Sequence, residues 1–224
     1  MAKRRKYTKY QQVRGLTPRL RFALLCLPIF LLTPSKPFQR EITHRIESFD
    51  KNSGKALHEL LKIYAVIKPY RPEVKDSLVW AMAEAVFDES LRHSLDPMLV
   101  LAVIKVESRF DHAALSSKGA RGLMQILPFV GNALAEELQL QRWEGEDSLD
   151  NPTLNIKLGV FYLSYLKKKF GDLNLALTAY NWGPGEVASR LEEEEEIPLG
   201  YAVKVLFDYH LYHNQLPPRE RSLK

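Results

Sequence analysis

The segment from Asp96 to Glu107 constrains the fold of this 224-residue chain more than any other. An acid followed at once by proline is a strong helix start, because Asp caps the first turn and proline fits the first helical position. Met98 to Val106 follows and is apolar on nearly all sides apart from Lys105. A helix without a polar face has to be surrounded by other elements. We therefore predict a buried central helix that ends at Glu107.

The rest of the body carries further helix signals and no strand alternation of any length. Asp76 or Ser77 can cap one helix, Asn151-Pro152 starts another, and Asp172 starts a third directly after Gly171. The apolar spacing in these segments is close to the 3.6-residue period of a helix. The predicted helices cover residues 56–68, 76–91, 153–170 and 173–180, and roughly 185–196 and 199–213.

The positive net charge of +5 belongs to the N-terminus alone. Residues 1–40 hold ten Lys and Arg and no acid, which leaves 22 of the 32 bases against all 27 acids, a net charge of −5 for the remainder. Phosphate binding needs a basic face on the folded domain itself. We therefore expect no nucleic-acid partner.

A targeting element is predicted at the N-terminus. Residues 22–32 form an eleven-residue apolar run behind the basic stretch, which suits a signal peptide and falls short of the roughly 20 residues needed to span a bilayer. Thr33-Pro34-Ser35 is a weak cleavage pattern, so removal and retention as a short anchor both stay open. Residues beyond about 35 would be exported to the periplasm or cell envelope. A retained segment would associate with the inner membrane through residues 19–33.

The expected organisation has four parts. Residues 1–35 are the signal peptide or anchor, 36–75 a linker with a short helical pre-domain, 76–215 the catalytic domain, and 216–224 a C-terminal tail. The only cysteine, Cys26, lies in the apolar run, so the exported part has no disulfide and depends on core packing.

Glu107 is the first candidate for chemistry. Apolar walls and the negative end of the helix dipole both disfavour an ionised carboxylate, and both raise its pKa. A general acid working near neutral pH needs such a shift. Taken alone, however, this stretch favours a solvent-facing carboxylate paired with Lys105 or Arg109. Other parts of the chain have to decide between the two interpretations.

Two later stretches add to the case. Ser116 to Gln125 is a tight turn with two glycines, followed by Leu-Met-Gln opening a helix. Glycine lets backbone approach a ligand closely, and Gln125 could bind sugar amides or hydroxyls. Ala179 to Gly185 combines an aromatic ring, an amide and a turn, a mixture that stacks on and hydrogen-bonds carbohydrate.

In their order these stretches resemble the lytic transglycosylase catalytic domain of the soluble type, the SLT domain, which is related to goose-type lysozyme. Its Glu-Ser motif matches Glu107-Ser108, its Gly-Leu-Met-Gln motif matches residues 122–125, and its Ala-Tyr-Asn-x-Gly motif matches residues 179–183. The resemblance covers roughly residues 76–213. This chain departs from the family after Pro128, where Phe-Val-Gly replaces the frequent x-Thr-Ala. The late Tyr of the family is matched by Tyr201 without the Glu-Thr pair that often precedes it.

The resemblance implies a mainly α, lysozyme-like domain with a deep glycan-binding cleft. It implies a lyase that cleaves peptidoglycan at the β-1,4 bond between N-acetylmuramic acid and N-acetylglucosamine without water, which leaves 1,6-anhydromuramic ends. Glu107 would be the one catalytic residue, acting as acid and then as base. The residues implied to orient it or bind substrate are Ser108, Met124, Gln125, Tyr180, Asn181 and Tyr201.

Two other functions stay open at this point: a hydrolytic lysozyme on the same fold, and a non-catalytic wall-binding protein. Asp111 is the nearest alternative acid partner, and we expect it to cap the following turn instead. The acidic run Glu192 to Glu196 is interpreted as a solvated helix surface. The six histidines form no recognisable ligand motif, so neither a metal nor another cofactor is expected.

Overall fold

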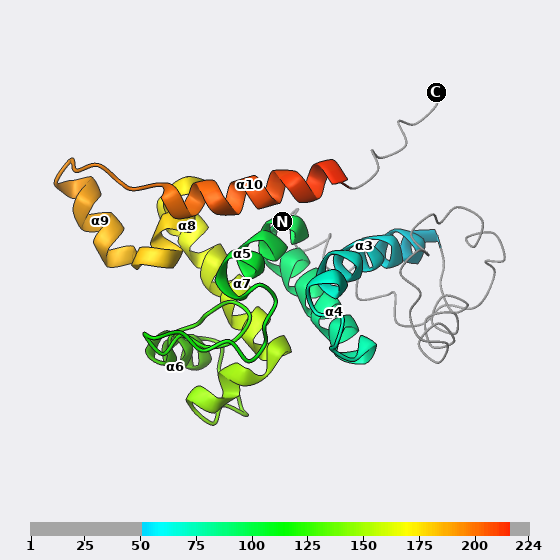
Figure 1. Cartoon of the computed structure of the whole chain (residues 1–224). Coiled ribbons are helices and arrows are strands. Elements are labelled where there is room, and N and C mark those ends of the chain that lie inside the picture. The colour runs from blue at the N-terminus through cyan, green and yellow to red at the C-terminus, as the bar shows by residue number, and fades with distance from the viewer. Residues whose placement is uncertain (1–50, 216–224) are drawn as a thin grey trace, which may run out of the picture.

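The structure is a computed structural model, and it describes residues 51–215. The apolar run at residues 22–32, the predicted signal or anchor and the tail at 216–224 lie outside the described residues. Figure 1 shows the described part as a set of helices joined by loops. They are α3 (Lys51–Ile67), η4 (Lys68–Tyr70), α4 (Asp76–His93), α5 (Pro97–Ser108), α6 (Pro128–Glu137), η5 (Glu146–Asp150), α7 (Pro152–Phe170), α8 (Leu173–Trp182), α9 (Pro184–Glu192) and α10 (Gly200–Gln215).

Three helices begin where their capping side chains predict. Asp96 accepts a hydrogen bond from the backbone N–H of Met98 at the start of α5. Asn151 accepts from two backbone N–H groups of the first turn of α7, and Asp172 accepts from the N–H of Leu175 in α8. Gly171 ends α7 with a φ of 70°, a conformation that glycine adopts without strain. These short-range predictions are confirmed.

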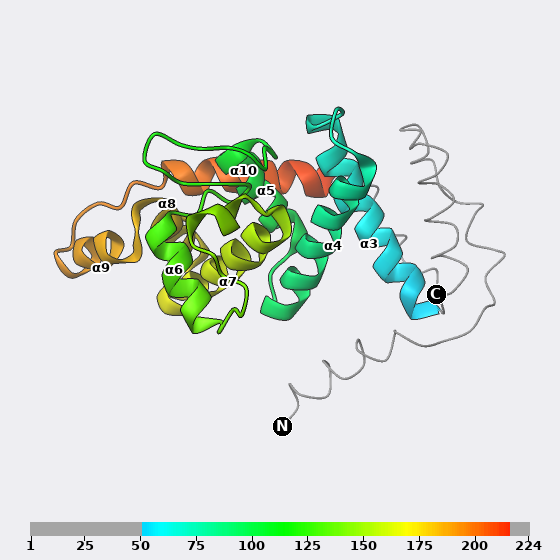
Figure 2. The same ribbon diagram turned by 90° about the horizontal axis from the view of Figure 1, so that it is seen from below.

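Helix α5 is the centre of the core, as its sequence predicts. Every residue from Met98 to Ile104 is buried, and the helix packs against α10, α4 and α3. Helix α7 packs on α4 and α8 and completes the core. Figures 1 and 2 place α3 and α9 at opposite ends of the molecule, with α5 and α7 between them. Helices α3, α4, α7, α8 and α10 share one core with α5, and that core holds in place the end of α5 that carries Glu107.

The segment expected to be a separate pre-domain joins this same core. Ile63, Tyr64 and Ile67 of α3 are buried in one cluster with residues of α4, α5 and α7. The boundary at residue 75 therefore does not separate two cores in the structure. Helix α3 also begins earlier than expected, at Lys51 rather than residue 56.

Several local predictions were wrong. Residues 122–125 do not open a helix: they form a turn, and α6 begins only at Pro128. Helix α9 ends at Glu192, so the rest of the acidic run is loop rather than helix surface. Helix α4 begins after Lys75, and no side chain caps it.

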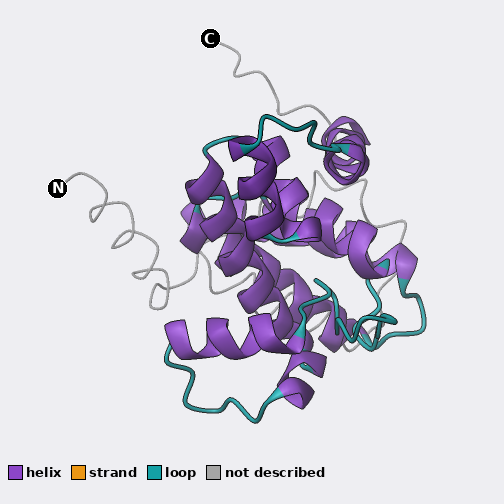
Figure 3. Cartoon of the chain, turned by 90° about the vertical axis from the view of Figure 1, so that its left-hand side faces the viewer, coloured by secondary structure: helices purple, strands orange, loops and turns teal. Residues whose placement is uncertain are grey.

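Figure 3 shows the helices and loops of residues 51–215 without a strand. Two isolated bridges, Leu115 with Arg121 and Arg121 with Ile126, are the β-type pairings in this part of the chain. Within the same residues, none of the helices is both long and apolar enough to cross a membrane.

Candidate active site

Glu107 occupies the last turn of α5, at the point where the chain leaves the core. Ser108 is the last residue of the helix, and the two residues after it, Arg109 and Phe110, have φ angles of 52° and 63°, in the left-handed region. Side chains other than glycine rarely adopt this conformation, and a bulky residue such as Phe110 does so only under strain. Phe110 is only 1% exposed. The end of the helix is therefore followed by a sharp and tightly packed turn.

One side chain hydrogen-bonds the Glu107 carboxyl. The Tyr201 hydroxyl, from the first turn of α10, donates to Oε1 of Glu107 at 2.5 Å. Burial raises the pKa of Glu107 from its usual 4.5 to about 7, and the hydrogen bond from Tyr201 partly opposes that rise. At neutral pH such a carboxyl exists in both protonation states. It can therefore give up a proton and take one back.

Tyrosines gather around the carboxyl. Burial raises the pKa of Tyr180 and of Tyr201 well above the usual value, and the negative charge on Glu107 adds to both rises. Tyr162 packs against Tyr180, with ring centroids 5.4 Å apart. All three phenols are thus neutral donors at physiological pH, and Glu107 is the titrating group among them.

Residues 121–126, called the glycine turn below, lie next to this carboxyl. The Ser108 hydroxyl, one residue after Glu107, donates to the carbonyl of Leu123 at 2.7 Å. The Tyr180 hydroxyl donates to the carbonyl of Met124 at 2.8 Å. Side chains from α5 and α8 therefore hold the backbone of the turn from two sides.

Asn155 of α7 holds the glycine turn from a third side. It is fully buried, its Oδ1 accepts from the N–H of Met124 at 2.7 Å, and its Nδ2 donates to the carbonyls of Arg121 and Leu149, each at 2.9 Å. A buried amide that satisfies three backbone groups fixes their positions strongly. Asn155 was not singled out from the sequence. The feature of the sequence that could have identified Asn155 is its polar side chain on a helix face that is otherwise apolar.

Two glycines make this approach possible. At Gly122, with a φ of 75°, a Cβ would lie 2.4 Å from Nδ2 of Asn155. At Gly159 of α7, a Cβ would lie 2.4 Å from the sulfur of Met124. Both distances are far below van der Waals contact. The glycines of this site therefore serve close packing between the turn and α7, rather than the approach of a ligand.

The expected roles of three site residues change. Met124 is 0% exposed and packs in the core, so its side chain presents no surface to a ligand in this structure. The Ser108 hydroxyl bonds backbone carbonyls rather than Glu107. Gln125 uses its amide nitrogen on the carbonyls of Ala114 and Gly122, which stabilises its own loop. Each of the three supports the turn, since each interaction goes to backbone or core.

Of the other predicted residues, Tyr180 and Tyr201 are partly buried beside Glu107, and Asn181 is exposed. Tyr201 contacts Glu107 directly, although the residues around it depart most from the family motif. Tyr180 lies between Glu107 and the glycine turn. Asn181 is exposed near the end of α8 and is the predicted binding residue most accessible to a ligand.

Other charges near the helix end are engaged elsewhere. Lys105 forms an ion pair with Asp208 of α10, so it does not pair with Glu107. Asp111 accepts from the N–H of Ala113, as expected for a turn cap, and its other oxygen pairs with Arg71 at 2.8 Å. Among the described residues, no group of three or more His, Cys, Asp or Glu side chains could hold a metal ion.

A hollow of about 460 Å³ lies between α9 and the start of α10 rather than at Glu107. Arg190, Glu195, Glu196 and Pro198 line it. None of the predicted site residues is among them. The deep cleft around Glu107 that the resemblance implies therefore stays a prediction.

Lytic murein transglycosylases are similar to part of this chain. The soluble lytic murein transglycosylase of Salmonella typhimurium is 31% identical over 138 residues, which cover 55% of this chain and 21% of that protein. The membrane-bound lytic murein transglycosylase C of Histophilus somni is 32% identical over 119 residues, 48% of this chain and 32% of that protein. This chain spans about a fifth of the length of the first two curated relatives that it matches.

Solved structures share the fold. The 70 kDa soluble lytic transglycosylase of Escherichia coli superimposes with a TM-score of 0.56 at 21% identity, over 72% of this chain and 30% of that one. An inactive mutant of lytic transglycosylase Slt from Pseudomonas aeruginosa gives 0.54 at 24% identity, over 79% and 32%. The mainly α, lysozyme-like fold predicted from the sequence is confirmed.

The family model described as the transglycosylase SLT domain matches residues 84–198, which are 115 of the 224 residues. The matched range contains Glu107, the glycine turn and Asn181, and it ends just before Tyr201. This chain therefore belongs to the transglycosylase SLT domain family.

Proposed function

We propose that this chain is a peptidoglycan lytic transglycosylase with Glu107 as its single catalytic acid and base. The observation that carries the proposal is the state of that carboxyl: buried at a helix end, bonded by Tyr201, with a pKa of about 7. A carboxyl of this kind is half protonated near neutral pH. The family membership of residues 84–198 supports the same reaction.

The reaction needs one proton carrier in two steps. In the first step the Glu107 carboxyl gives its proton to the glycosidic oxygen, the bond from that oxygen to C1 of N-acetylmuramic acid breaks, and the N-acetylglucosamine 4-hydroxyl leaves. The acetamido oxygen of the same muramic residue bonds to C1 and carries the positive charge. In the second step the Glu107 carboxylate takes the 6-hydroxyl proton, and that oxygen displaces the acetamido oxygen from C1. A 1,6-anhydro ring forms, and Glu107 is protonated again.

The surroundings of Glu107 suit a mechanism with one carboxylate. Most glycosidases use two carboxylic acids that flank the scissile bond. Asp111 is the next acid along the chain, and its two oxygens are engaged by Arg71 and by the N–H of Ala113. The substrate's acetamido and 6-hydroxyl groups would supply both nucleophiles, so a second carboxylate is not required.

The predicted binding residues divide by exposure. Asn181 and Tyr201 are proposed to contact the glycan, because Asn181 is exposed and Tyr201 reaches the catalytic carboxyl. Ser108, Gln125 and Tyr180 are proposed to act mainly by holding the glycine turn in place. Polar groups held this firmly offer a preorganised surface to a substrate.

A location in the bacterial envelope follows from the substrate and from the predicted N-terminal signal or anchor. The names of the relatives include both soluble and membrane-bound transglycosylases. We propose export to the periplasm, with the domain held at the inner membrane if residues 1–35 are retained. Fractionation of cells that produce the full chain would locate it, and recovery in the cytoplasm would contradict the proposal.

The products decide between the proposed reaction and its rivals. The full chain would be incubated with purified peptidoglycan, and the released fragments weighed by mass spectrometry. Muramic ends lighter by one water than reducing ends support a transglycosylase, and reducing ends would identify a lysozyme. Glu107→Gln should lower the rate of release about 10³-fold while the circular dichroism spectrum is unchanged. No release by the unaltered chain would point to a binding protein.

A further inference from the structure

Two residues outside the range matched by the family contact the turn that follows Glu107. They are Tyr70, the last residue of η4, and Arg71 directly after it. The Tyr70 ring lies 4.9 Å from the Phe110 ring between centroids. Nη2 of Arg71 lies 2.8 Å from Oδ2 of Asp111. The segment before α4 is thus in contact with the chain three and four residues after the candidate catalytic acid.

The contacted backbone is strained. Arg109 and Phe110 are both in the left-handed region, directly after Glu107 and Ser108. Such conformations persist where surrounding contacts over-determine them. Within this turn, the N–H of Arg109 bonds the carbonyl of Lys105, and the N–H of Asp111 bonds the carbonyl of Ser108. The side chains of this turn are also contacted by the ring of Tyr70 and the guanidinium of Arg71.

Tyr70 also contacts α5 itself. Nζ of Lys105 lies 5.9 Å from the centre of the Tyr70 ring and pairs with Asp208 of α10. Because α10 also carries Tyr201, the same small region joins η4, the end of α5 and the helix that hydrogen-bonds Glu107. A shift of Tyr70 would therefore act on both sides of the carboxyl.

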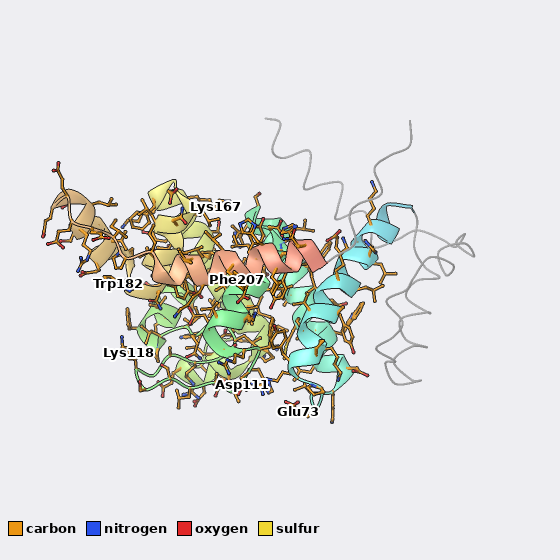
Figure 4. All side chains as sticks on the ribbon, turned by 45° about the horizontal axis from the view of Figure 1, so that its top comes forward. Glu73, Asp111, Lys118, Lys167, Trp182 and Phe207 are labelled. Carbon is orange, nitrogen blue, oxygen red and sulfur yellow. The ribbon has the colours of Figure 1, made fainter. Side chains whose placement is uncertain are left out.

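Arg71 bridges two acids at the edge of the molecule. Figure 4 labels Asp111 and Glu73 near one another at the same edge, and Arg71 pairs with both, at 2.8 Å and 3.5 Å. Its Nε is buried without a hydrogen-bond partner in the structure, so the guanidinium is held against the protein rather than free in solvent. The pair with Asp111 thereby ties the loop before α4 to the turn after α5.

We propose that Tyr70 and Arg71 are positioning residues, which hold residues 109–111 in their strained turn and so set the direction of the Glu107 carboxyl. The inference rests on the proposed function, because a role in positioning is defined only for an enzyme that turns over. These residues lie apart from Asn181, the exposed residue proposed to contact glycan. They act on turnover and leave glycan binding unchanged.

The test compares Arg71→Met with Lys68→Met in the full chain. Lys68 belongs to the same segment, but its ammonium pairs with Asp76 at 2.9 Å and donates to the carbonyls of Pro72 and Val74 rather than to residues 109–111. Arg71→Met should lower kcat about tenfold with KM for soluble glycan strands within twofold, because small misplacements of a catalytic group are costly. Lys68→Met should leave both constants within about twofold. Thermal unfolding of each variant shows how much folded protein is present.

Rescue by related variants separates positioning from general damage. Arg71→Lys keeps the charge and should restore part of kcat. The exchanged pair, Arg71→Asp with Asp111→Arg, should have a higher kcat than either single variant. Tyr70→Leu tests the ring contact with Phe110 independently and should also lower kcat with little change in KM.

Several results would overturn the inference. They are an Arg71→Met variant with unaltered kcat, a loss that Lys68→Met matches, or a loss that appears in KM instead. An unaltered chain that cleaves no glycan would contradict the proposed function, and the inference with it, whereas the results above contradict the inference alone. Glu107→Gln should bind soluble glycan strands equally well with and without Arg71→Met, and weaker binding with Arg71→Met would also overturn the inference.

Discussion

The glycine turn and the acidic segment, residues 193–196, are two loops that are held in different ways. Asn155, Ser108 and Tyr180 bond the backbone of the glycine turn from three helices. The acidic segment is exposed, and its ion pairing runs through Arg190 on the surface. A loop is fixed firmly when buried side chains satisfy its backbone groups, whereas exposed ion pairs add little.

The comparison indicates the role of the Gly-Leu-Met-Gln motif in this chain. From the sequence, the motif is typical of a ligand-binding loop. In the structure, Met124 is fully buried and the Gln125 side chain hydrogen-bonds the backbone of its own loop. Its residues support the turn beside Glu107. Among the predicted binding residues, Asn181 remains the most accessible to a ligand.

Removing the central support of the glycine turn should have the largest effect on stability. Asn155→Ala would leave the buried N–H of Met124 without its side-chain partner, and it would remove one hydrogen bond each from the carbonyls of Arg121 and Leu149. We expect the free energy of unfolding to fall by about 3 kcal/mol or more. Chemical denaturation measures it, and a loss below about 1 kcal/mol would show that the turn is held by something else.

The pH dependence of stability should reveal the carboxyl that the turn surrounds. The folded state binds the Glu107 proton more tightly than the unfolded state, so stability falls as pH rises from about 4.5 to about 7 and levels off above. Glu107→Gln removes that fall. The variant should be close to the unaltered protein at pH 4 and more stable by about 3 kcal/mol at pH 8. The same difference in free energy of unfolding between variant and unaltered protein at both pH values would contradict the raised pKa of Glu107.

Tyr201 should have a smaller effect, seen mainly in the pH profile. Its hydrogen bond favours the ionised form of Glu107, so Tyr201→Phe should raise the pKa of Glu107 further. The alkaline limb of kcat against pH would then move upward, and the maximum rate should fall about tenfold with the lost orientation. A limb that moves downward would show that the hydrogen bond has a different role.

Changes in the acidic segment should have the smallest effect. Arg190 pairs with Glu186 at 2.9 Å and with Glu195 at 3.1 Å, all on the surface. Arg190→Gln should change the free energy of unfolding by less than about 1 kcal/mol, and less still at high salt. If it costs as much as Asn155→Ala, the contrast between the two loops is wrong.

Parts of the fold were predictable because their causes are local. Asp96, Asn151 and Asp172 cap helices with bonds to residues two or three positions away, so their sequence neighbourhood is sufficient. The burial of α5 follows from its apolar residues alone. The course of residues 122–125 was missed, because Ser108 and Asn155 determine it from 15 and 31 residues away.

The candidate site was predictable mainly through the family resemblance. Glu107 and Tyr201 are 94 residues apart, and no spacing pattern reveals that they meet. The contacts of Tyr70 and Arg71 lie outside the matched range, so neither pattern nor resemblance pointed to them. The direction of the Glu107 pKa shift was predictable by physical reasoning, since burial at the end of an apolar helix follows from the residues before it.

The most direct test of the account is the pKa of Glu107 itself. An NMR titration of the full chain with ¹³C-labelled glutamate side chains, assigned by comparison with Glu107→Gln, would report the carboxyl resonance across pH. The account predicts a midpoint near 7, well above the usual 4.5. A midpoint close to 4.5 would mean that the carboxyl is solvated and ionised at neutral pH, and it would contradict its role as the catalytic acid.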